Sequence, residues 1–247
     1  MSNAPEAPPI YRTMPLPAGA DAAVEAVRAA AAGADPATLF WVDRSDRAQC
    51  AVTLSPDEPL RRSAQLVYVA MAALGDGLAA ALPPFLVVGF DMPDKVLLNE
   101  AELGRVRVLR PADCAADAVP GWLVAAIDIG VTRYPEGSAE AADLTRTTFE
   151  DEGCMGVSAG EVSGAFARYL LSWIDRWQRD GFAPVRTSWL TYASLDREAG
   201  ALRLGGRTVV GRAAGLSDGG DLLLETPDGE QAVAAAELTE AFDGAAG

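Results

Sequence analysis

A long helix with a single apolar face constrains the fold most. Between Glu161 and Arg179, apolar residues recur at steps of three and four positions: Val162, Phe166, Tyr169, Leu170, Trp173, Ile174 and Trp177. Such a helix is stable only when its apolar stripe is buried against another layer. The aromatic side chains would also suit a ligand site, but we assign them to the core. The chain must therefore supply a second layer that covers this face.

Short runs rich in β-branched residues supply that layer as strands. They lie at 39–42, 51–54, 85–88, 96–98, 106–109 and 123–129. Further helices are predicted at 21–32 and 60–82. The helix at 60–82 carries Asp76 and two glycines, so we interpret it as a buried helix rather than a membrane span. We expect an α+β fold: a mixed β-sheet of about six strands flanked by helices.

After Asp196 the sequence pattern changes from helical periodicity to short apolar runs separated by turn residues. Runs at 206–214, 221–225 and 231–234 are typical of short strands, and Asp-Gly turns separate them. Strands at this spacing favour a small β-barrel. We therefore divide the chain into a large domain at 1–196 and a small β domain at 197–247.

Charge and residue usage exclude several classes of function. The net charge of −15 disfavours binding to nucleic acid and docking to anionic membranes. Histidine is absent, which removes Ser-His-Asp triads, Cys-His pairs and His-ligated zinc, so no metal site is predicted. Three widely spaced cysteines and the lack of a secretory signal favour a reducing, cytoplasmic location.

Two stretches resemble a known family. The run DMPDKVLLNEAELGRVRV at 91–108 is similar to the central segment of biotin–protein ligases. That segment reads K-W-P-N-D, followed by a strand and then Asn-Gly. Pro93 and Asn99 match its Pro and its Asn. The run GRTVVGRAAGLSDGGDLLLETPDGE at 206–230 resembles their small SH3-like C-terminal domain. Over residues 20–235 the chain is identified as a divergent member of the biotin/lipoate A/B protein ligase superfamily.

The resemblance implies a fold and partners. The fold would be a mixed sheet flanked by helices, like the class II synthetases and biotin–lipoate ligases, with a small C-terminal SH3-like β-barrel. The partners would be a small acyl or carboxylate ligand and a biotinyl or lipoyl carrier domain, and a homodimer is left open. Ligases of this superfamily form an acyl-adenylate and pass the acyl group to a carrier lysine, which implies ATP and Mg²⁺ if that activity survives.

The residues that such ligases use are replaced. Adenylation places negative charge on phosphates, which needs cations and backbone N–H groups aimed at them. Asp91 and Glu102 occupy the positions of the two family lysines, and Asp128 replaces a glycine in the next strand. The Gly/Arg-rich loop corresponds to DRSDR, Asp43 to Arg47, which has no glycine. No catalytic residue is therefore assigned.

Residues in these segments remain as candidates for ligand binding because of their charge or their place in the motif. They are Arg44, Arg47, Asp91, Met92, Pro93, Asp94, Lys95, Arg105 and Asp128. Arginine clamps phosphate or carboxylate groups through two parallel hydrogen bonds, whereas the acidic residues would suit a cation or an amine. Pairing of the arginines with surface carboxylates is the simpler alternative.

Three functions follow from this pattern. The preferred one is a binding or regulatory pseudo-ligase for a small acyl or carboxylate ligand or a carrier domain. The alternative is a divergent ATP-dependent biotin/lipoate ligase or acyltransferase, with Arg44 and Arg47 relocated over the phosphates. Acyl transfer through Cys154 and Lys95 is off register with the octanoyl transferases. The third function is an assembly module without a small ligand.

Overall fold

A mixed sheet forms the centre of the protein. The structure is a computed structural model that describes residues 3–195, 197–204 and 207–242. Seven strands follow the order β1-β2-β3-β7-β6-β5-β4, and β12 pairs with β6. Only β1–β2 and β12–β6 run parallel among the described pairs. The strand bounds are β1 Arg12–Leu16, β2 Thr38–Val42, β3 Arg47–Leu54, β4 Val88–Asp91, β5 Lys95–Leu98, β6 Ala101–Pro111, β7 Leu123–Gly130 and β12 Glu240–Phe242.

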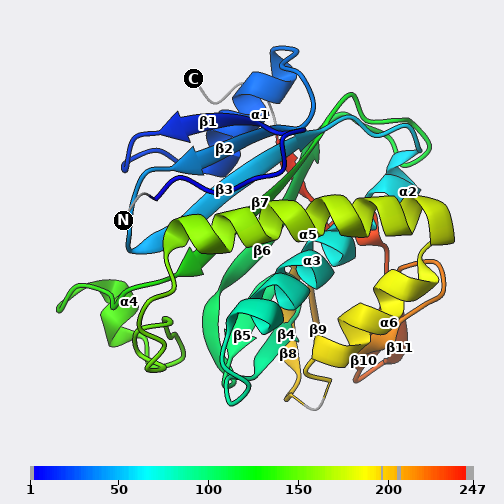
Figure 1. The fold of residues 1–247 in the computed structure, drawn as a ribbon. Coiled ribbons are helices and arrows are strands. Elements are labelled where there is room, and N and C mark those ends of the chain that lie inside the picture. The colour runs from blue at the N-terminus through cyan, green and yellow to red at the C-terminus, as the bar shows by residue number, and fades with distance from the viewer. Residues whose placement is uncertain (1–2, 196, 205–206, 243–247) are drawn as a thin grey trace.

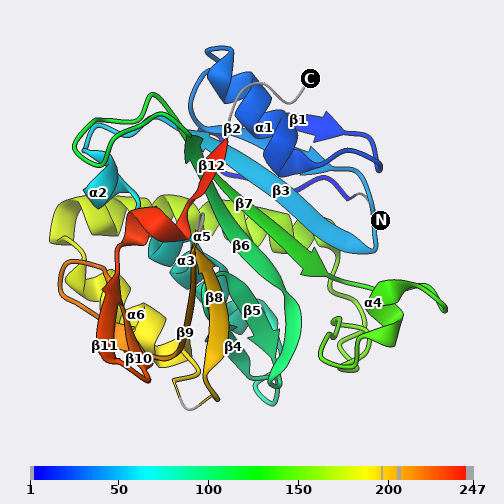
Figure 2. The ribbon, with the colours of Figure 1, turned by 180° about the vertical axis from the view of Figure 1, so that it is seen from behind.

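Helices cover the two faces of this sheet unequally. The long helices α3 (Leu66–Ala81) and α5 (Ala159–Asp180) lie across one face, with α6 (Ala183–Tyr192) beside them (Figure 1). On the other face α1 (Ala22–Ala31) packs mainly on β2, β3 and β7 and touches β6 less, so part of this face around β6 is left open (Figure 2). Two further helices are short: α2 (Leu60–Ser63) and α4 (Ala139–Ala142).

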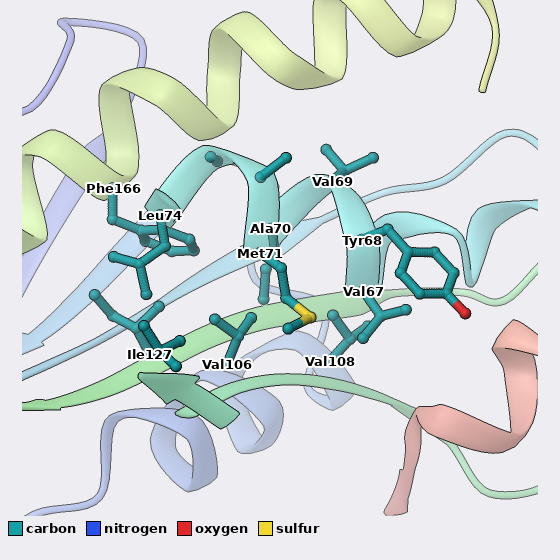
Figure 3. Packing of buried hydrophobic residues seen from close by; sticks show 14 of the residues in the cluster. Val67, Tyr68, Val69, Ala70, Met71, Leu74, Val106, Val108, Ile127 and Phe166 are labelled. Atoms are coloured by element: carbon teal, nitrogen blue, oxygen red, sulfur yellow. The ribbon is translucent and has the colours of Figure 1, made fainter. Parts of the chain in front are cut away.

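The main core lies between the sheet and α3 and α5. Met71 and Leu74 of α3, Phe166 of α5, Val106 of β6 and Ile127 of β7 belong to one buried cluster (Figure 3). Burying a side chain of this kind contributes about 1.5–3 kcal/mol. The segment 60–81 is long and apolar enough to span a membrane, but most of it is buried inside the protein. It therefore serves as the core helix that the sequence predicts, although it divides into α2 and α3.

Local signals set the two ends of α5. Ser158 and Glu161 form a reciprocal capping box at its start, which satisfies two backbone N–H groups. Gly181 follows its last residue at a φ of 76°, a value that glycine adopts without steric cost. Phe166 and Trp173 are buried, so the assignment of the apolar stripe to the core is confirmed.

A second, antiparallel sheet follows α6. Its order is β11-β10-β9-β8. The bounds are β8 Gly200–Leu204, β9 Arg207–Leu216, β10 Leu222–Thr226 and β11 Gly229–Val233. A 3₁₀ turn, η1 (Ala235–Leu238), then leads into β12, which returns to the large sheet. The expected fold class, a mixed sheet flanked by helices with a small SH3-like C-terminal unit, is confirmed. Division of the chain at 196/197 stays a prediction.

Some elements differ from the prediction. The strand expected at 85–88 begins only at Val88, because its ladder with β5 starts where Val88 faces Leu98. The strand expected at 206–214 is β9; Gly206 lies outside the described residues. Strands β1, β8 and β12 were not predicted. β12 has only three residues, which is too short for a periodic pattern.

Candidate functional site

A row of polar side chains crosses the open face of the large sheet. Gln49 of β3 faces Asp128 of β7, and Asp128 faces Arg105 of β6. Arg105 in turn faces Lys95 of β5, which faces Asp91 of β4. Residues directly opposite one another in antiparallel strands share a face. Apolar residues next to them along each strand belong to the α3–α5 core, so the row lies on the opposite face.

Arg47 and Asp128 form a largely buried ion pair at one end of the row. Arg47 Nε donates to Asp128 Oδ1 at 2.7 Å, and Gln49 Nε2 donates to Asp128 Oδ2 at 3.0 Å. The two charged side chains are 15% and 29% exposed. Burial lowers the pKa of Arg47, but the hydrogen bond and the charge of Asp128 outweigh it, so the pKa is raised. Arg47 is thus held as a cation by the protein's own carboxylate.

Arg44 is held in the same way within the loop that joins β2 and β3. Arg44 Nε donates to Asp46 Oδ1 at 2.7 Å, and Arg44 Nη1 donates to Gln49 Oε1 at 3.3 Å. The hydrogen bond from Arg44 lowers the pKa of the Asp46 carboxyl. Both arginines of the DRSDR segment are therefore engaged by side chains of the same chain, which is the arrangement that we gave as the simpler alternative.

A second group of charges surrounds Glu102 at the start of β6. The nearest oxygen of Glu102 lies 3.6 Å from Lys95 Nζ, 3.8 Å from Arg105 Nη2 and 3.9 Å from Arg146 Nη2. These distances exceed those of hydrogen bonds, so no cation is tightly bound. The Glu102 side chain is only 13% exposed. One carboxylate is thus shared loosely among three cations.

The remaining motif residues lie beside this group. Asp91 Oδ2 is 3.7 Å from both Lys95 Nζ and Arg197 Nε. Asp94 Oδ2 is 3.7 Å from Arg105 Nη1, and burial raises the pKa of the Asp94 carboxyl. The structure therefore brings Asp91, Asp94, Lys95 and Arg105 together around Glu102.

Met92 and Pro93 line a different space. Together with Lys95, Arg197 and Leu224, they border a cavity of about 680 Å³ between β4–β5 and the small sheet. Lys95 belongs both to this cavity and to the charge group at Glu102. The cavity is therefore continuous with the charged row at one of its edges.

A smaller cavity lies between the row and the first turn of α1. It has a volume of about 220 Å³, and its polar lining residues are Asp21, Gln49, Arg105, Arg107, Asp128 and Glu240. Arg107 Nε and Nη2 donate to the two oxygens of Glu240 at 2.7 and 2.6 Å. The oxygen Oδ1 of Asp21 accepts from the backbone N–H groups of Ala23 and Val24 at the start of α1.

Several of these residues are outside our sequence-based candidates. Arg146 reaches Glu102 because the segment around it pairs with the start of β6, where Glu102 N donates to Thr145 O at 2.7 Å. Arg197 and Glu240 arrive from beyond α6. No local pattern marks any of the three, since each acquires its role through a distant pairing.

The aromatic ring of Tyr134 lies between Arg47, which pairs with Asp128, and Arg146, which lies near Glu102. The ring of Tyr134 lies 5.8 Å from the guanidinium of Arg47 and 5.4 Å from that of Arg146. Among the described residues, Tyr134 Oη and Arg146 Nε are buried and have no hydrogen-bond partner. Buried polar atoms in this state mark a place where water or a ligand would bind.

Cys154 lies apart from this face. It lines a cavity of about 980 Å³ at the ends of α3 and α5, whereas Lys95 lines the cavity beside the small sheet. The described residues contain no group of three Cys, Asp or Glu side chains that would hold a metal ion. The two residues needed for acyl transfer of the octanoyl-transferase type line different cavities.

Comparison with known proteins agrees with this architecture. A biotin–[acetyl-CoA-carboxylase] ligase of Paracoccus denitrificans is 28% identical over 201 residues, covering 80% of this chain and 82% of that protein. A crystal structure of a biotin protein ligase-like protein of unknown function from Silicibacter sp. TM1040 superposes with a TM-score of 0.82 at 24% identity, covering 94% and 98% of the two chains. The biotin protein ligase of Aquifex aeolicus shares the fold at a TM-score of 0.68 and 18% identity, covering 90% and 95%.

Family models cover both parts of the chain. Residues 201–238 match the biotin protein ligase C-terminal domain, which coincides with the small sheet and the turn that follows it. Residues 7–191 match the model of the biotin/lipoate A/B protein ligase family, which coincides with the large sheet and its helices. This chain belongs to the biotin/lipoate A/B protein ligase family.

Proposed function

We propose that this chain binds a small acyl or carboxylate ligand on the open face of its large sheet and does not ligate it to a carrier. One observation carries the proposal: the cations expected to meet phosphates are either replaced or already paired. In the segment that resembles the family motif, Asp91 and Glu102 correspond to its two lysines, and in the structure Arg47 is held by Asp128 at 2.7 Å.

The cost of recruiting Arg47 to a phosphate supports this function. The Arg47–Asp128 pair is largely buried, so moving the guanidinium to a ligand would leave Asp128 without its strongest partner. Breaking a buried pair in this way costs about 3–5 kcal/mol. A loop without glycine also turns its backbone N–H groups toward a phosphate less readily, because only glycine adopts the required conformations without steric cost.

A transfer assay tests the proposal directly. The full chain would be incubated with ATP–Mg²⁺, biotin or lipoate, and a biotinyl or lipoyl carrier domain, and the carrier mass would be measured. The biotin ligase of Paracoccus denitrificans serves as the positive control. We expect no mass increase, together with a thermal shift on adding biotin, lipoate or octanoate. Modified carrier at a rate above background would refute the pseudo-ligase.

A second function, a divergent ATP-dependent ligase, is favoured by the charges at Glu102. Three cations lie 3.6–3.9 Å from that carboxylate without tight pairing, and Arg146 Nε has no partner among the described residues. Loosely held cations are available to a phosphate, unlike Arg44 and Arg47. If transfer is observed, replacing Arg105 and Arg146 by glutamine should abolish it, whereas replacing Arg44 should not.

We further propose a biotinyl or lipoyl carrier domain as the protein partner, in a cytoplasmic setting. This proposal is supported by the similarity to the biotin–[acetyl-CoA-carboxylase] ligase of Paracoccus denitrificans, whose protein substrate is a carboxylase. Size-exclusion chromatography of the chain with such a domain would show a complex. The homodimer stays a prediction that the same experiment tests.

A further inference from the structure

Arg107 binds the carboxylate of Glu240 with the bidentate geometry that arginine uses to bind ligand carboxylates. Its Nε and Nη2 atoms donate to both oxygens of Glu240, at 2.7 and 2.6 Å. Two parallel hydrogen bonds of this kind are how arginine recognises a carboxylate in a binding site. Arg107 lies on β6 in the middle of the sheet and borders the 220 Å³ cavity. Its bonding partner is therefore also part of the cavity lining.

Glu240 comes from a segment with few other attachments. It begins β12, whose three residues pair with β6 only at Leu109–Pro111. Besides this ladder, the segment is held by Arg110 Nε, which donates to Thr239 Oγ1 at 3.0 Å, by Ala112 N, which donates to Phe242 O at 3.2 Å, and by the partly buried side chain of Phe242. A strand of three residues that pairs with one neighbour opens at a lower free-energy cost than the central strands of a sheet.

The two partners differ in how easily they can move. Arg107 is 27% exposed and is fixed by strands on the sheet, whereas Glu240 is 43% exposed. A half-exposed carboxylate regains most of its hydration when it leaves. The guanidinium of Arg107 would stay behind in the cavity. An entering carboxylate would find this cation in place once Glu240 has left.

The other charges of the cavity do not offer a better anchor. Asp128 is bound by Arg47 and Gln49, and Asp21 caps α1. Arg105 divides its charge between two carboxylates, with Nη1 at 3.7 Å from Asp94 and Nη2 at 3.8 Å from Glu102. Arg107 is the cavity cation whose present partner is both bidentate and replaceable.

We propose that Arg107 is the carboxylate-binding residue of the 220 Å³ cavity and that Glu240 occupies its place until a ligand carboxylate displaces it. This inference rests on the proposed function, because it names the anchor of the same acyl or carboxylate ligand. Ligand binding then detaches Glu240 and loosens β12 from β6. Glu240 acts as an internal competitor that sets the ligand affinity.

The experiment compares ligand affinity in matched variants. Biotin and octanoate would be titrated by calorimetry into the wild-type chain and into the Glu240→Gln, Glu240→Ala and Arg107→Gln variants. The control is Glu237→Gln, which removes a carboxylate paired with Arg207 at 2.5 Å outside the cavity. We expect at least tenfold tighter binding in both Glu240 variants, loss of binding in Arg107→Gln and no change in the control. Hydrogen exchange at 240–242 should rise when ligand binds the wild type.

The outcomes separate this inference from the proposed function. If a probe binds the wild type with the same affinity as the Glu240 variants, Glu240 is not a competitor and only this inference is overturned. If the Glu240 variants bind more weakly, Glu240 is part of the recognition site and the inference is likewise wrong. If neither probe binds any variant, the carboxylate site and the proposed ligand class are both wrong. Circular dichroism of each variant checks that it is folded.

Discussion

Replacing Asp128 by asparagine tests whether the pair with Arg47 is held as tightly as its geometry indicates. Asp128 accepts from Arg47 at 2.7 Å and from Gln49 at 3.0 Å, and asparagine can satisfy only one of these donors. The Arg47 side chain is 15% exposed, so water restores little of the lost interaction. A hydrogen bond to a charged group is worth about 1.5–3 kcal/mol. We expect Asp128→Asn to lower the free energy of unfolding by about 2 kcal/mol, or Tm by roughly 4–8 °C.

Urea unfolding followed by tryptophan fluorescence would measure this change. A double-mutant cycle with Arg47→Gln isolates the pair, and we expect a coupling energy above about 1 kcal/mol. The control is Glu25→Gln, which breaks an exposed i,i+3 pair with Arg28. Exposed pairs are worth about 0–1 kcal/mol, so the control should change little. A coupling energy near zero would show that Arg47 is free to serve a ligand, and the main argument against phosphate binding would fail.

Three further predictions follow from the same face and the core behind it. Burial raises the pKa of the Asp94 carboxyl, so the folded state binds a proton at Asp94 more tightly than the unfolded state does. The stability that protonated Asp94 gives the fold is therefore present in acid and is lost as the pH rises through the raised pKa. Asp94→Asn should therefore have a higher Tm than the wild type at pH 7, and the gain should vanish below about pH 4; a lower Tm at pH 7 would contradict it. A Cβ at Gly104 would lie 2.9 Å from Ile129 Cα and closer still to the carbonyl oxygen of Asp128. Gly104→Ala should therefore lower the free energy of unfolding in urea by about 3 kcal/mol or more. The control Gly121→Ala, whose Cβ would lie in open space, should lower it little. Burial raises the pKa of Cys50 to about 12, so iodoacetamide at pH 8 should leave this thiol unmodified in the folded protein and modify it in urea; rapid native labelling would disprove its burial.

Local signals explain why most elements are predictable. The apolar spacing from Val162 to Trp177 acts within one helix, so the sequence predicts a helix from Glu161 to Arg179, within two residues of the bounds of α5. The strands β3, β5 and β7 are likewise marked by β-branched runs. The start of β4 could not be predicted, because it depends on where Leu98 lies in the neighbouring strand.

The site could be predicted only in part. Asp91, Lys95, Arg105 and Asp128 were candidates because they lie in motif-like segments, and the strand register then places them in one row. Register is set by tertiary pairing, so the sequence does not reveal which charge meets which. The pairing of Arg107 with Glu240 joins positions 133 residues apart and has no local signature.

Strand β12 fastens the small sheet to the large one at a second point. The small sheet follows α6, and the chain returns to the large sheet at β12, so both ends of the small sheet are attached. Between these ends, Gln65 Nε2 donates to Gly219 O and Arg186 Nε donates to Leu216 O, both at 2.7 Å, and Leu216 and Leu222 belong to the main apolar core. The 680 Å³ cavity between Met92 and Leu224 can therefore widen only if these contacts also change. Detachment of β12 would free one end of the small sheet while its core contacts stay in place.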